Sequence, residues 1–209
     1  MSRRPSLCGV ILAAGESSRM GTDKALLPWP PAAPGQASAG KSFLSAAIEA
    51  LSACTEMVIV VAGKNEAALA PVVYANGAFL VSNPDSSRGQ FSSLQVGLQH
   101  VLGRGRDAAM VTLVDRPPAK SLTLEKLRDT FETVISHGKW AVVPEFGGKH
   151  GHPIILGREM MEKFLRAPVT ATAREIEHQN QERIEYVPVD DPFVTMNVDT
   201  PQDYAGLKS

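Results

Sequence analysis

The residues with the clearest chemistry lie in a loop near the start of the chain, residues 12–24. The loop follows a short apolar run and contains Gly15 and Gly21 together with the cations Arg19 and Lys24. Glycine lets the backbone approach an anion closely, and consecutive backbone N–H groups in such a loop form an anion-binding concavity. A guanidinium grips phosphate through paired hydrogen bonds, and an ammonium acts as a point charge. The pattern predicts a loop that holds phosphates; the alternative is an ordinary strand-to-helix turn with solvated charges.

A second stretch, residues 35–42, matches the P-loop pattern G-x-x-x-x-G-K-[ST] letter for letter. A P-loop needs a buried strand directly before it and a helix directly after it. A helix is expected here, but prolines between residues 28 and 34 occupy the place of the strand, and proline is excluded from a central strand. The loop at residues 12–24 is therefore the better candidate, and an NTPase that uses Lys41 is kept as an alternative.

Asp115 is the main candidate for a metal ligand, because it ends the strongly apolar run at residues 109–114. A carboxylate in that place suits Mg²⁺, which prefers hard oxygen ligands and commonly bridges substrate phosphates. Asp199 is a candidate second ligand, although an acidic or hydroxyl residue before Pro201 also serves as a helix N-cap. Asp115 keeps the alternative of a turn or cap residue. Sequence distance alone leaves open whether the two aspartates meet.

Two polar loops supply further candidate contacts. Residues 83–93 hold hydroxyls, backbone N–H groups and Arg88 at an expected helix start, which suits an anionic or polar substrate. An ordinary capped loop is the alternative there. Residues 147–153 place His150 and His152 between two expected strands. Two histidines at this spacing invite a metal hypothesis, but no third ligand is evident, so contact with substrate or a plain turn is favoured.

The composition is that of a soluble globular protein. The 209 residues are 44% hydrophobic and 21% charged, and the formal net charge is −1. This charge gives no reason to expect nucleic acid or a membrane surface as partner. Cys8 and Cys54 are isolated, which favours a reducing compartment and core packing over a disulfide framework. The sequence shows no signal-peptide pattern and no apolar run near the roughly 20 residues of a membrane span, so a cytoplasmic protein is expected.

Strands alternate with helices along the chain, which predicts an α/β fold around a mainly parallel sheet. Ligands of such sheets bind beyond the carboxyl ends of the strands, so the first loop, Asp115 and the loop at residues 83–92 are expected to meet at one edge. A single domain over residues 1–209 is expected, with the proline-rich segment 29–40 as a surface insertion. Strands are expected at 7–13, 58–61, 78–81, 109–114, 140–143, 153–156 and 184–189. Helices are expected at 43–51, 65–72, around 94–101, at 123–137, 158–166 and 172–179, and after Pro201.

Four blocks of this sequence occur in a characteristic order: residues 12–28, 89–98, 148–153 and 198–204. The first resembles the opening motif of the nucleotidyltransferases related to molybdenum cofactor cytidylyl- and guanylyltransferases. The second resembles the serine-rich loop and following helix of that family. The third is similar to its glycine-histidine-proline turn, and the fourth to its C-terminal Asp-Thr-Pro motif. Together the blocks span nearly the whole chain.

The resemblance implies a Rossmann-like nucleotidyltransferase fold, a three-layer α/β/α arrangement with a mainly parallel mixed sheet. It implies transfer of a nucleoside monophosphate from an NTP to a phosphorylated acceptor, with Mg²⁺ as cofactor and release of pyrophosphate. The form Ala13-Ala14-Gly15 is similar to the cytidylyltransferase branch, so CTP is the favoured nucleotide and molybdopterin the first acceptor to consider. A partner enzyme in cofactor delivery belongs to the same expectation.

The expected reaction assigns roles to individual residues. Arg19, Lys24 and Asp115 are the expected catalytic residues, and Asp115 and Asp199 the expected Mg²⁺ ligands. The acceptor side is expected to be formed by Ser92, Ser93 and His152. The residues expected to bind the nucleotide are Leu12, Ala13, Ala14, Gly15, Arg19 and Lys24.

The chain departs from the family pattern beside Asp115. The family usually has Gly-Asp-x-Pro where this chain has Val114, Asp115, Arg116 and Pro117. The aspartate is kept, valine replaces glycine, and Arg116 adds a bulky cation. Val114 and Arg116 favour a further alternative, a catalytically impaired nucleotide-binding module of the same fold.

Overall fold

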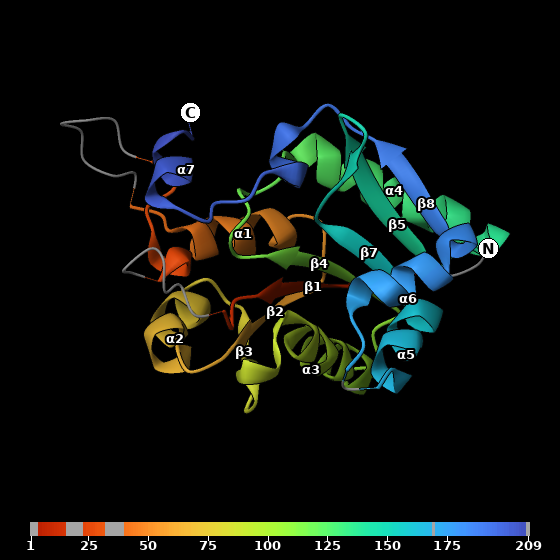
Figure 1. Ribbon diagram of the computed structural model, residues 1–209, viewed down its shortest axis with the longest axis horizontal. Coiled ribbons are helices and arrows are strands. Elements are labelled where there is room, and N and C mark those ends of the chain that lie inside the picture. Colours follow the sequence, from red (N-terminus) through yellow and green to blue (C-terminus); the bar gives the residue numbers. More distant parts are fainter. Residues whose placement is uncertain (1–3, 16–22, 32–39, 169, 208–209) are drawn as a thin grey trace.

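The computed structural model describes residues 4–15, 23–31, 40–168 and 170–207. Its strands are β1 (Leu7–Leu12), β2 (Met57–Ala62), β3 (Phe79–Ser82), β4 (Ala108–Leu113), β5 (Ala141–Phe146), β6 (Lys149–His150), β7 (Ile154–Gly157) and β8 (Ile184–Pro188). They form one mixed sheet in the order β3-β2-β1-β4-β7-β5, with β6 and β8 also paired to β5. Figure 1 shows how this sheet runs through the middle of the molecule.

Helices cover both faces of the sheet (Figure 1). One face is covered by α1 (Phe43–Ser52), α2 (Glu66–Ala75) and α4 (Ser121–Val134). The other is covered by α3 (Gln90–Gly103), α5 (Arg158–Arg166) and α6 (Ala173–Gln179). The short helix α7 (Pro201–Ala205) lies beside the segment that leads into α1, where the Tyr204 hydroxyl donates to the carbonyl of Pro28. This arrangement confirms the expected three-layer α/β/α fold.

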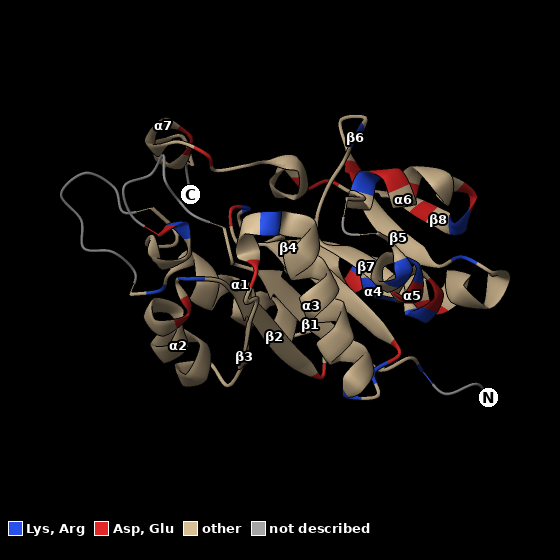
Figure 2. Cartoon of the chain, turned by 60° about the horizontal axis from the view of Figure 1, so that its bottom comes forward, with Lys and Arg blue, Asp and Glu red and all other residues tan. Residues whose placement is uncertain are grey.

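The central strands are apolar because the sheet is buried on both faces. No charged residue occurs in β1, β2 or β4, and Figure 2 shows them in the neutral colour. Continuous apolar strands of this kind are typical of parallel sheets covered by helices on both sides. Within the described ranges, no helix is both long enough and apolar enough to cross a membrane.

The sheet is mainly parallel, as expected, with one central exception. Strands β3, β2, β1 and β4 run parallel, and so do β5 and β8. Strand β7 lies antiparallel between β4 and β5. The reason is the connection that precedes it, because β5 and β7 are joined by a short glycine-rich turn, and parallel strands require a long crossover instead.

Two segments differ in detail from the sequence expectation. The turn at residues 146–152 contains the short strand β6, which pairs back on β5. Gly147 and Gly148 adopt φ values of 57° and 73° there, a region that favours glycine. The irregular segment at residues 190–200 contains a 3-10 turn, η5 (Pro192–Thr195). The remaining helices and strands lie close to the expected ranges.

Candidate active site

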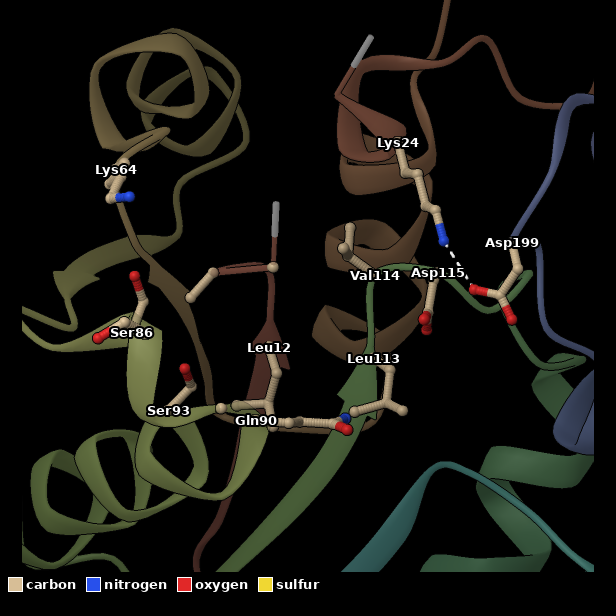
Figure 3. A pocket seen from close by; sticks show the side chains of 14 residues that line it. Leu12, Lys24, Lys64, Ser86, Gln90, Ser93, Leu113, Val114, Asp115 and Asp199 are labelled. Carbon is tan, nitrogen blue, oxygen red and sulfur yellow. Dashed lines mark hydrogen bonds and ion pairs between the residues drawn. The ribbon is translucent and has the colours of Figure 1, made fainter. Parts of the chain in front are cut away.

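A pocket of about 660 Å³ lies at the carboxyl ends of β1 and β4. Its size is within the roughly 300–1,000 Å³ that is usual for small-molecule sites. Figure 3 shows its walls, which come from the loop after β1, the loop after β2, the start of α3, the end of β4 and the segment before α7. The lining residues are Leu12, Ala14, Gly15, Lys24, Lys64, Ser86, Ser87, Gly89, Gln90, Ser93, Leu113, Val114, Asp115 and Asp199. The expected meeting of these loops at one edge of the sheet is confirmed.

Lys24 reaches into the pocket from a short 3-10 turn, η1 (Lys24–Leu26). The turn begins at Asp23, whose carboxylate accepts a hydrogen bond of 3.0 Å from the backbone N–H of Ala25. The Lys24 side chain is only 14% exposed, and its Nζ lies 2.9 Å from Asp199 Oδ1. This contact, drawn as a dashed line in Figure 3, joins the N-terminal part of the chain to its C-terminal segment on one side of the pocket.

Asn65 is a residue that the sequence analysis missed. Its amide nitrogen donates to the carbonyl of Ala13, at 2.9 Å, and to the carboxylate of Asp23, at 2.6 Å. Its amide oxygen accepts a bond of 3.1 Å from the backbone N–H of Gly63. One side chain therefore ties the end of β1, the loop after β2 and the cap of the turn that carries Lys24. Its type alone, a single asparagine in an ordinary helix start, carried no signal of this role.

The two candidate metal ligands, distant in sequence, are neighbours in space. The backbone N–H of Val198 donates to the carbonyl of Asp115 at 2.8 Å, which holds Asp199 next to that residue. The backbone N–H groups of Asp199 and Thr200 both donate to the carboxylate of Asp203, at 3.0 and 2.8 Å. Asp199 is thus held in place by its own backbone hydrogen bond and by those of the residues before and after it. Thr200 is the N-cap of α7, so the cap interpretation of this motif is correct for Thr200, while Asp199 faces the pocket.

The pKa of the Asp115 carboxyl group is shifted by burial and by three charged neighbours. Burial raises the pKa of its carboxyl group, while the cations Lys24 and Arg116 lower it and the carboxylate of Asp199 raises it further. Its Oδ1 is buried and has no hydrogen-bond partner among the described residues. A buried carboxylate oxygen without a donor, beside a second carboxylate, suits a hard divalent cation. Within the described ranges, however, no group of three or more His, Cys, Asp or Glu residues converges on such a site.

The start of α3 forms the wall opposite Lys24. Gly89 precedes this helix with φ of 91°, and Gly89, Gln90 and Ser93 all line the pocket. Unpaired backbone N–H groups at a helix start attract anions. Ser92 and Ser93 both accept hydrogen bonds of 2.9 Å from the amide of Asn83. Both serines are buried, but Ser93 borders the pocket, whereas Ser92 donates to the carbonyl of Gly89 at 2.7 Å.

The opening loop is placed as expected where it is described. Leu12, Ala14 and Gly15 line the pocket. Ala13 is 1% exposed and does not line the pocket, and its backbone N–H donates to the carbonyl of Val61 at 2.8 Å. Arg19 lies outside the described residues.

His152 lies beside the site, not on the wall of the pocket. Burial, together with the nearby Arg116 cation, lowers its pKa to about 3, so the ring is neutral. Its Nδ1 is buried without a hydrogen-bond partner among the described residues. Its assignment to the acceptor side stays a prediction.

The P-loop alternative receives no support from the described part of its motif. Ser42 is the N-cap of α1 and completes a capping box with Ser45. Lys41 pairs with Glu49 on the exposed side of that helix and does not line the pocket.

Lys64 is a charged lining residue that the sequence analysis missed, whereas Gln90 belongs to the candidate loop at residues 83–93. Figure 3 places Lys64 across the pocket from Lys24 and lays the Gln90 side chain across the floor between Leu12 and Leu113. Lys64 closely follows β2, a strand of the parallel part of the sheet, and this position is the signal that would have found it.

Comparison of the sequence with known protein families identifies the family of this chain. The MobA-like NTP transferase domain matches residues 9–184. This chain belongs to the MobA-like NTP transferase family. The match extends from β1 to the beginning of β8, so most of the pocket lies within it, while Asp199 lies after it. The resemblance inferred from the motifs is confirmed.

The chain is also similar to individual relatives and solved structures. A probable molybdenum cofactor guanylyltransferase of Rhodopirellula baltica is 36% identical over 113 residues, which are 54% of this chain and about half (50%) of that relative. The molybdenum cofactor cytidylyltransferase of Escherichia coli K12 is 23% identical over 95% of this chain and 94% of its own length. The crystal structure of Rv0371c from Mycobacterium tuberculosis H37Rv has a TM-score of 0.78 at 25% identity, covering 96% of this chain and 97% of that one. A manganese complex of Rv0371c has a TM-score of 0.75 at 24% identity, covering 97% of each chain.

Proposed function

We propose that this protein transfers CMP from CTP to a phosphorylated acceptor, with molybdopterin as the first acceptor to test, and releases pyrophosphate. The observation that carries this proposal is the grouping of Lys24, Asp115 and Asp199 at the carboxyl ends of β1 and β4. These three groups, together with Lys64 on the opposite side of a pocket of nucleotide size, suit a ligand that combines phosphates with a divalent cation.

The residues that would hold the metal are Asp115 and Asp199. The unpartnered Oδ1 of Asp115 supports this assignment, and so does the crystallisation of Rv0371c with manganese. The remaining ligands would be phosphate oxygens and water, because Mg²⁺ commonly keeps waters and takes few protein ligands. When bound, the ion would neutralise charge on the triphosphate.

The chain's own residues would supply position and charge. An oxygen of the acceptor phosphate attacks the α-phosphorus as the bond from this phosphorus to the bridging oxygen breaks, and pyrophosphate departs in line. Lys24 neutralises the triphosphate, with Arg19 proposed for the same role, while Ala14 and Gly15 let the main chain approach it. Catalysis of such transfers rests on positioning and electrostatic stabilisation and needs no covalent intermediate.

The choice of CTP and of the acceptor is supported by two separate observations. The sequence Ala13-Ala14-Gly15 resembles the motif of the cytidylyltransferase branch, and Ala14 lines the pocket. The relatives from R. baltica and E. coli are both named for the molybdenum cofactor, one as a guanylyltransferase and one as a cytidylyltransferase. Ser93 borders the pocket, and Ser92 and His152 are proposed to shape the acceptor side from behind it.

The decisive experiment is a pyrophosphate-release screen of CTP, GTP, ATP and UTP against molybdopterin and a panel of other phosphorylated acceptors. We expect turnover with CTP and molybdopterin. We expect Lys24→Met and Asp115→Asn to reduce kcat/KM by about 10²–10³-fold, the usual loss when one preorganised charged contact is removed. Circular dichroism of each variant checks that it is folded.

Lys41→Met is the matched control, because it removes an exposed lysine near Lys24 in sequence that does not line the pocket. It should turn over like the parent protein. A P-loop NTPase would give the reverse result, with loss of activity in Lys41→Met and little change in Lys24→Met. Binding of CTP and Mg²⁺ in calorimetry without turnover on any acceptor would instead support an impaired nucleotide-binding module.

A further inference from the structure

The carbonyl oxygen of Val194 is a junction between three segments of the chain. The Nη1 of Arg116, from the loop after β4, donates to it at 2.8 Å. The backbone N–H of His152, from the turn before β7, donates to it at 2.8 Å. Val194 itself lies in η5 and is completely buried. Its carbonyl therefore binds the loop of Asp115 and the β6–β7 turn to the segment that leads to Asp199.

The β6–β7 turn packs tightly against this carbonyl at Gly151. A Cβ atom placed on Gly151 would lie only 2.2 Å from the carbonyl oxygen of Val194 and 2.6 Å from its carbon. The β6–β7 turn thus presses directly on the junction, and only glycine fits at that point. The position of residue 194 is set by contacts on two sides.

The junction has a second tether four residues further along the chain. The backbone N–H of Val198 donates to the carbonyl of Asp115, and Val198 is 1% exposed. Residues 194–198 are therefore held at one end by Arg116 and at the other by Asp115. Asp199 follows immediately and directs its carboxylate to Lys24 (Figure 3).

We infer that Arg116 is a positioning residue, which clamps the carbonyl of Val194 and so holds Asp199 beside Asp115, where the two carboxylates would share a divalent cation. This inference rests on the metal site of the proposed function. It assigns a role to the residue at the variable position of the family pattern Gly-Asp-x-Pro, and it makes this bulky cation an aid to the site and not a sign of impairment.

The burial of Arg116 supports a specific purpose for this side chain. Its Nε is buried without a hydrogen-bond partner among the described residues. Burial lowers the pKa of its guanidinium, and the carboxylates of Asp115 and Asp199 oppose that effect. A buried, incompletely bonded guanidinium is unfavourable for folding, so a neutral apolar side chain would be the better choice if packing were all that mattered.

Mn²⁺ binding to the folded protein tests the inference directly. The variants are Arg116→Met, which removes both charge and donor, and Arg116→Lys, which keeps them. Free Mn²⁺ is measured by electron paramagnetic resonance during titration with Mn²⁺ alone. We expect Arg116→Met to weaken Mn²⁺ binding by about tenfold or more, the range found when residues behind metal ligands are changed. Arg116→Lys should recover most of the affinity.

Arg158→Met is the matched control. Arg158 also donates from its guanidinium to a backbone carbonyl, that of Arg106, but on the exposed surface and away from the pocket. It should bind Mn²⁺ like the parent protein. Equal Mn²⁺ affinity in Arg116→Met and the parent would overturn the inference while leaving the proposed function intact, whereas no Mn²⁺ binding by the parent itself would contradict the metal site on which both rest.

Hydrogen exchange provides a readout that does not depend on metal. In the metal-free protein, the backbone amide of Val198 should exchange faster in Arg116→Met than in the parent or in Arg158→Met, because the segment 194–198 has lost one tether. Slow exchange that is unchanged in Arg116→Met would show that Arg116 does not hold this segment. If Arg116→Met fails to fold, the same two measurements on Arg116→Gln replace it.

Discussion

Three residues beside the pocket bury polar atoms that have no hydrogen-bond partner among the described residues. These atoms are Asp115 Oδ1, Arg116 Nε and His152 Nδ1. Each unsatisfied buried group costs about 1–3 kcal/mol. Burial favours the neutral form of each group. It therefore raises the pKa of Asp115 and lowers the pKa of Arg116 and of His152. The concentration of these costs in one place is what is expected where a binding site, and not the core, dictates the residue types.

His152 should make the protein sensitive to acid. Burial lowers its pKa to about 3 in the folded state, whereas in the unfolded chain it titrates near 6.5. Between these values the unfolded chain binds a proton that the folded protein does not, so the free energy of unfolding falls as the pH is lowered, by up to about 1.4 kcal/mol per pH unit. Urea unfolding of His152→Gln between pH 7 and pH 4 should show a shallower decline than the parent. Parallel declines would contradict the buried neutral ring.

Helix α3 reaches the pocket because it can lie very close to the sheet. A Cβ atom on Gly97 would lie 2.8 Å from Val10 Cγ1 and 3.1 Å from Val61 Cγ2. The absence of a side chain at this point lets the helix rest on β1 and β2. This contact in the middle of the helix positions its first residues, Gln90 and Ser93, at the pocket.

Gly97→Ala should therefore destabilise the protein although alanine favours helices. Overpacking a well-filled interior usually costs about 1–3 kcal/mol. Gly103→Ala, at the end of the same helix, is the matched control, because a Cβ atom there meets nothing within 4 Å. It should be neutral or stabilising by up to about 1 kcal/mol. Urea unfolding of both variants checks this, and equal stabilities would show that the sheet can yield at Gly97.

The segment that follows β8 crosses back to the pocket and is attached there to the rest of the molecule. Asp191 is completely buried there and accepts hydrogen bonds from the backbone N–H of Lys120, at 2.8 Å, and from the Thr123 hydroxyl, at 3.0 Å. It also caps its own turn through the N–H of Phe193 at 3.1 Å. One carboxylate thus fastens the start of α4 to the segment that carries Val194 and Asp199.

Asp191→Ala should lower the free energy of unfolding by about 3 kcal/mol or more, because it leaves several buried donors without an acceptor. The neighbouring Asp190 is exposed, so Asp190→Ala is the control and should stay within about 0.5 kcal/mol of the parent. Urea unfolding measures both. A loss below 1 kcal/mol in Asp191→Ala would mean that water replaces the lost carboxylate.

Much of this protein follows from local sequence patterns. The apolar runs predicted the central strands, and the alternation of strands with helices predicted the layered fold. The strand before residues 12–24 distinguished the candidate phosphate loop from the P-loop-like segment, in which Lys41 instead pairs with Glu49 on the surface. These features depend on neighbouring residues, whose spacing and burial the order of the chain already specifies.

Only the tertiary structure decided which distant residues meet. The contact of Lys24 with Asp199, the bridge of Asn65 to Ala13 and Asp23, and the junction at Val194 each join segments far apart in the sequence. No periodicity encodes such pairs, because they depend on where strand order, turns and buried hydrogen bonds bring the loops. The sequence by itself determined the fold class and the family motifs, and the folded arrangement determined which carboxylates and cations share the pocket.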